Sequence, residues 1–226
     1  MGRTPENHSR EAKVSELGRA YVDALLAADQ AGAEIAVREA MDASFSTAEI
    51  DEEIIAPALW LIGDLWERGE ITVADEHIAT EISLRVIALQ REARRVAMAR
   101  AGHRVMLAAP TGEMHVVALR MVDNLLRQAG YEVLMLGADV PVEALIAAVH
   151  RRSPRVVCLT ATMVNGADQS LAAVGAVQQR WPSVRFVLGG RGMTSQVQSR
   201  PGVEVCRRVS EVVEAVDAMV SGAGLN

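Results

Sequence analysis

The sequence predicts an α/β protein in which a helical bundle precedes a doubly wound parallel sheet. Two observations support this prediction: apolar residues recur at helical spacing up to residue 99, whereas short apolar runs alternate with amphipathic stretches in the remainder. Half of the 226 residues are hydrophobic and only 3% are aromatic, so Ala, Val and Leu must build the core. The length suits two small domains. We therefore expect a disordered tail over residues 1–11, a four-helix bundle over 12–101 and an α/β domain over 102–226.

The expected bundle contains clear helix starts. Ser46 and Glu49 form an S-x-x-E pattern, which is a capping box, and Gly69 ends the apolar face that follows it. Thr72 and Asp75 resemble a second capping box before a long helix. Helices of this number in so short a segment indicate a small bundle. The apolar residues of the two helical faces are Ile54, Ile55, Ala58, Leu59, Ile62 and Leu65, then Ile78, Ile82, Val86, Leu89 and Ala93.

The second half of the chain alternates strand and helix patterns. Its apolar runs are nearly continuous, as in parallel strands that are covered on both faces, so we expect a Rossmann- or flavodoxin-like sheet of about five strands. Ligands on such sheets bind at the carboxyl ends of the strands, near a topological switch point. The expected strands are 104–109, 131–136, 155–160, 184–189 and a weak 203–206, and the expected helices are 116–128, 142–151, 169–180 and 210–220.

The charge and the absence of targeting signals argue against nucleic-acid binding, secretion and a membrane span. The net charge is −6, and an acidic chain repels a phosphate backbone, so we expect no direct binding of nucleic acid. Cys158 and Cys206 fit no metal or redox spacing. The polar N-terminus lacks the apolar core of a signal peptide, and no apolar stretch of about 18 residues is free of charge. We therefore expect a cytoplasmic protein that does not span a membrane.

A short loop after the first expected strand carries the residues best suited to chemistry. Gly112, Glu113 and His115 lie there, at the carboxyl edge of the sheet and directly before a helix. Glu113 could accept a hydrogen bond from the His115 imidazole, and a carboxylate in this place commonly supports a metal-bound histidine. A histidine beside an acid is also common in loops without a ligand, so spacing alone leaves both interpretations open.

Small residues stand where the other expected strands end. The third strand ends in Thr160, Ala161 and Thr162, the fourth in Gly189 and Gly190, and the first in Ala108 and Ala109. These residues leave a slot that a large flat or elongated ligand could enter. They would equally allow the helices to pack closely against the sheet.

Together these loops resemble the three-part signature of cobalamin-binding domains, which runs DxHxxG, then SxL or a variant, then GG. Glu113 replaces the aspartate and Ala118 the last glycine of the first motif. The resemblance implies a bound cobalamin whose cobalt takes His115 as lower ligand in place of the cofactor's own dimethylbenzimidazole base. The freed nucleotide tail would then enter the slot. The implied cofactor contacts are Gly112, Glu113, Met114, His115, Val116, Thr160, Thr162, Gly189 and Gly190.

In the bundle, Trp66 is followed after nine residues by Glu76 and His77. By pattern alone these are a core aromatic and an exposed first helical turn. In a bundle before a cobalamin-binding domain, they resemble the CarH/LitR class of B12-dependent photoreceptors. That resemblance implies adenosylcobalamin, with the bundle capping the upper face of the corrin, Trp66 against the adenosyl group, and Glu76 and His77 helping to enclose it. Class members usually begin with a MerR-type DNA-binding domain, which we expect this chain to lack, and carry a histidine where this chain has Glu67.

Three functions are compatible with these resemblances. The first is a light sensor and regulator, not an enzyme, in which photolysis of the cobalt–carbon bond changes conformation or assembly; its partners would be further copies of the chain in the dark or a separate regulator protein. The second is a corrinoid carrier that passes a methyl group between methyltransferase partners. The third, an isomerase subunit, would need a substrate domain that we do not find. Trp66 with Glu76 and His77 favours the sensor, because a methyl carrier has no adenosyl group to enclose.

Overall fold

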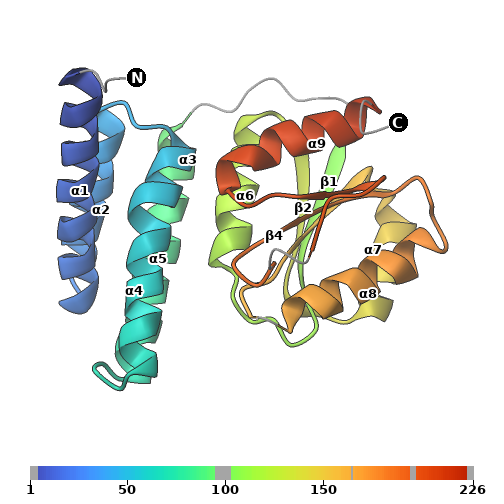
Figure 1. The fold of residues 1–226 in the computed structure, drawn as a ribbon, viewed down its shortest axis with the longest axis horizontal. Helices are drawn as coiled ribbons and strands as arrows, with labels where there is room; N and C mark the ends of the chain where they lie inside the picture. The colour runs from blue at the N-terminus through green and yellow to red at the C-terminus, as the bar shows by residue number, and fades with distance from the viewer. Residues whose placement is uncertain (1–4, 95–102, 164, 194–196, 223–226) are drawn as a thin grey trace. The chain divides into compact units, whose positions relative to one another are not determined.

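The computed structural model describes residues 5–94, 103–163, 165–193 and 197–222. The chain forms two compact units, Met1–Ala93 and Arg94–Asn226. The first unit is helical and the second contains the sheet (Figure 1).

The helical unit is a four-helix bundle, as predicted. Its third helix is a continuous helical stretch in which a π-helical turn, η1, separates α3 from α4. Helix α1 begins at Pro5, so the expected disordered tail over 1–11 is wrong for residues 5–11, which are helical. The helices are α1 Pro5–Leu26, α2 Gln30–Asp42, α3 Thr47–Ile50, η1 Asp51–Ile55, α4 Ala56–Glu67 and α5 Val73–Ala93.

Both expected helix starts are confirmed. The Ser46 side chain accepts a hydrogen bond from the backbone N–H of Glu49, and the Glu49 carboxylate accepts one from the backbone N–H of Ser46. Thr72 and Asp75 make the same reciprocal pair before α5. Each box satisfies backbone N–H groups that a helix start otherwise leaves without partners.

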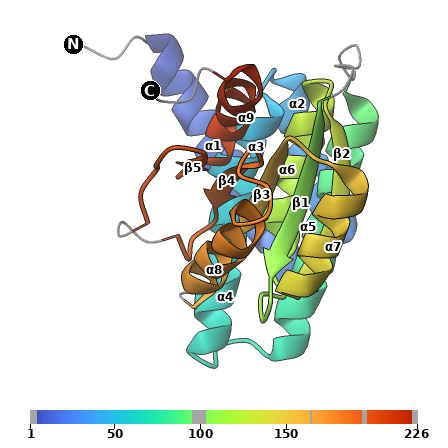
Figure 2. The ribbon, with the colours of Figure 1, turned by 90° about the vertical axis from the view of Figure 1, so that its right-hand side faces the viewer.

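The sheet unit contains five parallel strands in the order β2-β1-β3-β4-β5. Figure 2 shows β1 between β2 and β3. The chain leaves β1 toward one edge of the sheet and returns on the other side with β3, so the topological switch point lies between β1 and β3. The strands are β1 Arg104–Pro110, β2 Glu132–Val140, β3 Val156–Thr160, β4 Arg185–Gly189 and β5 Val203–Val205. The flavodoxin-like sheet of five strands is thereby confirmed.

Helices cover both faces of this sheet. Helices α6 and α9 contact each other and the strands on one face, and α7 and α8 do so on the other (Figure 1). A hydrophobic core lies on each face of the sheet, and alternate residues of β1 point into one or the other. Met106 packs with α7 and α8, whereas its buried neighbours Val105 and Leu107 point toward the face covered by α6 and α9. The helices are α6 Val117–Gln128, α7 Val142–Arg152, α8 Gly166–Gln178, the 3₁₀ turn η2 Val209–Glu211 and α9 Val212–Ser221.

Strand β2 differs from its expected range. It continues to Val140, four residues beyond the expected end at Leu136. Gly137, directly beyond the expected end, has a φ of +92° and stays within the strand at a register shift. A glycine in the left-handed region can form a bulge instead of ending a strand, and here the bulged strand carries Asp139 to the edge of the sheet.

Among the described residues, we find no helix with both the length and the apolar character needed to cross a membrane.

Candidate functional site

The loop between β1 and α6 lies at the topological switch point. Residues 111–116 follow the carboxyl end of β1, and residues 161–163 follow that of its neighbour β3. The two loops lead to helices on opposite faces of the sheet, α6 on one and α8 on the other. This is the place where doubly wound sheets bind ligands.

Glu113 joins these two loops through its carboxylate. Its Oε1 accepts a hydrogen bond from the backbone N–H of His115 at 2.9 Å. Its Oε2 accepts hydrogen bonds from the backbone N–H groups of Thr162 at 2.6 Å and Met163 at 3.0 Å. The side chain is only 1% exposed. A single buried carboxylate therefore holds the start of α6 against the end of β3.

The protonation of Glu113 follows from two opposed effects. Burial by itself raises the pKa of this carboxyl. The hydrogen bonds from the backbone N–H of Met163, from the backbone and ring of His115, and from the backbone N–H of Thr162 favour the charged form and together outweigh burial. The net pKa is below the ordinary value for glutamate, so this group is an anion at neutral pH.

His115 is oriented by that anion. Its ring Nδ1 lies 2.5 Å from Glu113 Oε1, and its side chain is 51% exposed. The contact favours the tautomer in which Nδ1–H donates to the carboxylate, which leaves Nε2 with a lone pair. A histidine whose other nitrogen donates to a carboxylate has the usual arrangement of a metal ligand.

The other described histidines of this unit stand in different surroundings. The His103 ring lies near Tyr131, at the amino end of β1, and the His150 ring lies near Trp181. Neither belongs to a loop at the carboxyl edge. The position in the sheet therefore distinguishes His115 as the candidate ligand.

The two predicted threonines at the end of β3 differ in their hydrogen bonds. Thr162 contributes its backbone N–H to Glu113. The Thr160 hydroxyl is buried and has no hydrogen-bond partner among the described residues. A buried hydroxyl without a partner is unfavourable, so a polar group of a ligand at this edge would stabilise it.

Two further predicted residues belong to the loop between β1 and α6. Met114 is exposed, and Val116 is the N-cap residue of α6.

The two predicted glycines, of which one ends β4 and the other follows it, differ in their surroundings. A Cβ on Gly190, whose φ is +102°, would lie 2.3 Å from the backbone oxygen of Ala161, whereas one on Gly189 would meet nothing closer than 3.6 Å. Gly190 is therefore required for the close approach of the β4 and β3 loops. Gly192 and Gly166 approach the same loop as closely, at Met163 and Ala161. Neither was predicted from the sequence, although each follows a strand end in the chain.

The predicted residues of the helical unit lie at one end of the α4–α5 hairpin. Trp66 is 46% exposed near the end of α4, and Glu76 and His77 lie in the first turns of α5. His77 Nδ1 lies 2.6 Å from Glu76 Oε2, and the Thr80 hydroxyl donates to the other oxygen of the same carboxylate. The hydrogen-bonded pair and the exposed Trp66 are thus brought to the same end of the hairpin by the turn between α4 and α5.

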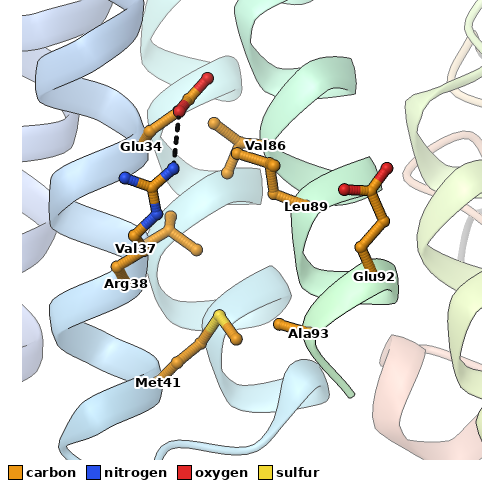
Figure 3. A pocket seen from close by; sticks show the side chains of 8 residues that line it. All are labelled: Glu34, Val37, Arg38, Met41, Val86, Leu89, Glu92 and Ala93. Atoms are coloured by element: carbon orange, nitrogen blue, oxygen red, sulfur yellow. Dashed lines mark hydrogen bonds and ion pairs between the residues drawn. The ribbon is translucent and has the colours of Figure 1, made fainter. Parts of the chain in front are cut away.

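A pocket of the helical unit lies elsewhere. It has a volume of about 280 Å³ and lies between α2 and α5 (Figure 3). None of the predicted site residues lines it, and its lining contains no histidine or cysteine. We therefore attach no function to its size. The residues that line it are Glu34, Val37, Arg38, Met41, Val86, Leu89, Glu92 and Ala93.

Two family models match the chain, and both describe a B12 binding domain. One matches residues 103–217, which is half of the chain, and the other matches residues 17–89 in the helical unit. The chain belongs to the B12-binding family. Cobalamin is therefore its cofactor, and the cobalt belongs to that cofactor.

Curated relatives fall into two groups. The HTH-type transcriptional repressor CarH of Myxococcus xanthus is 30% identical over 164 residues, which cover 71% of this chain and 54% of CarH. The trimethylamine corrinoid protein of Methanosarcina barkeri is 26% identical over 182 residues, which cover 76% of this chain and 82% of that protein. The chain thus spans about half the length of the first relative and most of the second.

A solved structure has the same fold. The monomethylamine corrinoid protein of Methanosarcina barkeri matches with a TM-score of 0.73 at 17% identity, over 90% of this chain and 99% of that one. At this identity the likeness concerns the fold, which agrees with the helical region and the five-stranded sheet described above.

The residues at the edge of the sheet fit a cobalamin. The half-exposed His115 ring has Nδ1 occupied and Nε2 available, which suits an axial ligand to cobalt. The unpartnered Thr160 hydroxyl stands at the same edge, where the polar nucleotide tail could satisfy it. When bound, the cofactor would supply the cobalt–carbon chemistry, and the protein would supply ligation and orientation.

Proposed function

We propose that this protein is an adenosylcobalamin-dependent light sensor with a regulatory role and no enzymatic activity of its own. His115 is the protein ligand to cobalt, and Glu113 sets its tautomer and orientation. Trp66 packs against the adenosyl group, with Glu76 and His77 beside it. Light releases the adenosyl group, and the loss of its contacts changes the conformation or the assembly of the protein.

The observation that carries this proposal is that the exposed Trp66 and the Glu76–His77 pair lie at the same end of the α4–α5 hairpin. An indole that is 46% exposed leaves apolar area in water. The adenine of an adenosyl group is a flat ring that such a surface can stack on, whereas a methyl group offers little area to it. The similarity to the repressor CarH over 71% of this chain supports the same assignment.

The test compares two tryptophans of the same helix. Trp66→Ala should weaken the binding of adenosylcobalamin by about tenfold, because one aromatic stack contributes about 1 kcal/mol or slightly more. It should change the affinity for methylcobalamin much less. Trp60→Ala is the matched control, because Trp60 lies six positions earlier on α4 and is 49% exposed. Titrations of the wild type and both variants in the dark, followed by visible absorption, give all six dissociation constants.

A methyl-carrier function is the second candidate. The alignment with the trimethylamine corrinoid protein covers 82% of that protein, more than the 54% covered in CarH. Under this alternative the partners are methyltransferases, and the upper face of the corrin must become accessible to them. Equal losses of affinity for both cofactors in Trp66→Ala would support the carrier and contradict the sensor.

A further inference from the structure

Asp139 has an unusual backbone conformation for its place in the fold. Four described residues other than glycine have a positive φ. Three of them follow the C-terminal ends of helices, where such a conformation is common: Ala28, Ser44 and Ser153. Asp139, with a φ of +48°, instead lies inside strand β2.

Two irregularities in β2 bring Asp139 to this position. Leu107 pairs with Met135 but Ala108 pairs with Gly137, so Leu136 is an extra residue. Pro110 then pairs with Val140, which leaves one more extra residue in β2. Bulges of this kind redirect side chains at the ends of strands. They place Asp139 beside the loop that follows β1.

Asp139 makes two hydrogen bonds to the main chain of Gly112 and of Glu113, the residue whose carboxylate orients His115. The backbone N–H of Gly112 donates a hydrogen bond to Asp139 Oδ1 at 2.8 Å. The backbone N–H of Asp139 donates one to the carbonyl oxygen of Glu113 at 2.9 Å. The main chain on both sides of the Gly112–Glu113 peptide bond is therefore fixed by one residue of the neighbouring strand.

We propose that Asp139 is a positioning residue for the cobalt ligand. It holds the main chain of Gly112 and Glu113, and through the Glu113 carboxylate it sets the place of the His115 ring. The inference rests on the proposed assignment of His115 as the ligand. Asp139 itself touches neither cobalt nor the corrin in this assignment.

The residue type fits this role. Aspartate and asparagine tolerate the left-handed conformation better than other residues with a Cβ, and both carry a side-chain oxygen that accepts from a nearby N–H. Gly112, with a φ of +80°, is free of steric contacts at its missing Cβ, so packing does not hold it in place. The hydrogen bond from its N–H to Asp139 therefore holds Gly112 in place.

The test separates the acceptor oxygen from the backbone conformation. Asp139→Asn keeps both, Asp139→Gly keeps only the conformation, and Asp139→Ala loses both. Ser153→Ala is the matched control, because Ser153 has a φ of +47° in the same unit but caps α7. Thermal unfolding of each apoprotein shows whether the variant is folded before cobalamin is added.

The readout is ligation, measured by electron paramagnetic resonance of the cobalt(II) form in protein labelled with ¹⁵N-histidine. A ¹⁵N ligand splits each cobalt line into a doublet, whereas the cofactor's own benzimidazole, with ¹⁴N, gives a triplet. The doublet therefore reports the histidine alone. The dissociation constant of cobalamin is measured on the same samples.

Asp139→Gly and Asp139→Ala should weaken binding by about fivefold, the effect of one hydrogen bond, and should reduce the doublet. Asp139→Asn and Ser153→Ala should match the wild type. A wild-type affinity and doublet in Asp139→Gly, or a loss in Asp139→Asn as large as that in Asp139→Gly, would overturn the inference. His115→Ala tests the proposed ligand separately: if its doublet persists, His115 is not the ligand and the proposed function fails on that point.

Discussion

At the scale of single residues, the length of the Glu113 side chain decides which groups it can reach. The carboxylate contacts His115, two positions away, and the amides of Thr162 and Met163, which lie 49 and 50 positions away. The family pattern that the loop resembles has an aspartate here. The additional methylene of glutamate lets one carboxylate serve both loops.

Glu113→Asp tests whether cobalamin binding depends on this reach across the two loops. The shorter side chain cannot hold the His115 ring and the Thr162 and Met163 amides together, so we expect cobalamin to bind about tenfold more weakly, as is typical when the support of a metal ligand is lost. Visible-absorption titration measures the change. Glu143→Asp, an exposed position at the start of α7 in the same unit, is the matched control and should have no effect. An unchanged affinity in Glu113→Asp would show that the contact across the loops does not matter for binding.

Tyr21 is a second residue whose environment has a measurable consequence. It is fully buried, and its hydroxyl lies 2.9 Å from Ser83 Oγ, which itself donates to the carbonyl of Ala79. Burial raises the pKa of Tyr21 far above its ordinary value. The folded state therefore favours the neutral phenol, and this contribution to stability is complete below pH 10 and decreases as the pH rises above it.

Tyr21→Phe should remove this pH dependence. At pH 7 the variant should lose about 1 kcal/mol of unfolding free energy, because one buried hydrogen bond is lost. Above pH 10 the wild type should lose stability and the variant should lose less, so the difference between them narrows. Urea unfolding followed by circular dichroism at both pH values measures this. Parallel pH profiles for the two proteins would contradict the assignment.

At the scale of elements, the capping box before α3 also connects two helices. Glu49 caps the helix through Ser46 and pairs with Arg10 of α1 at 2.7 Å. The hydrogen bond from Arg10, followed by the one from the Ser46 backbone, lowers the pKa of Glu49 to about 2. The contribution of the charged form to stability is therefore present above about pH 4.5 and is lost as the pH falls toward 2.

Glu49→Gln should lower the unfolding free energy by about 1 kcal/mol at pH 7, because the side chain is 42% exposed and solvent screens the ion pair. At pH 2 the variant and the wild type should be about equally stable. Arg10→Gln is the control: it removes the ion pair but keeps the cap, so it should flatten most of the pH dependence while costing less at pH 7. Chemical unfolding at both pH values distinguishes the three proteins. A constant difference between Glu49→Gln and wild type from pH 7 to pH 2 would argue against a charged Glu49 as the cause.

The strands and helices were predictable because their signals are local. Apolar runs placed β1, β3 and β4 within a residue of their observed bounds. The end of β2 was not predictable in this way, because Gly137 is compatible with a turn or with a bulge. Only the pairing of β2 with β1 selects the bulge, and that pairing depends on residues about 30 positions away.

At the scale of the whole molecule, charge is distributed unevenly along the chain. Residues 1–93 contain 8 Lys and Arg against 19 Asp and Glu, whereas residues 94–226 contain 15 and 10. The helical unit is therefore strongly acidic and would repel a phosphate backbone.

The proposed sensor should change its assembly in light. We expect the adenosylcobalamin-bound protein to be oligomeric in the dark and to change its mass after illumination, because contacts to the adenosyl group are lost. Size-exclusion chromatography with light scattering, in the dark and after green light, measures the change. The apoprotein and the hydroxocobalamin-bound protein are controls that carry no adenosyl group. Identical masses in both conditions would exclude assembly as the output of the sensor.

The sequence by itself determined the order of helices and strands, the two capping boxes and the loop that carries His115, because periodicity and capping depend on residues within a few positions of one another. The tertiary structure decided which groups meet there. Glu113 reaches the end of β3, Asp139 reaches Gly112, and Gly190 lies against Ala161. These contacts join residues 27 to 49 positions apart. The first two exist because the strand order places β1 between β2 and β3, and the third because β3 pairs with β4. That order depends on which strands pair across the sheet, and a hydrophobic pattern, being the same for every buried parallel strand, does not specify it.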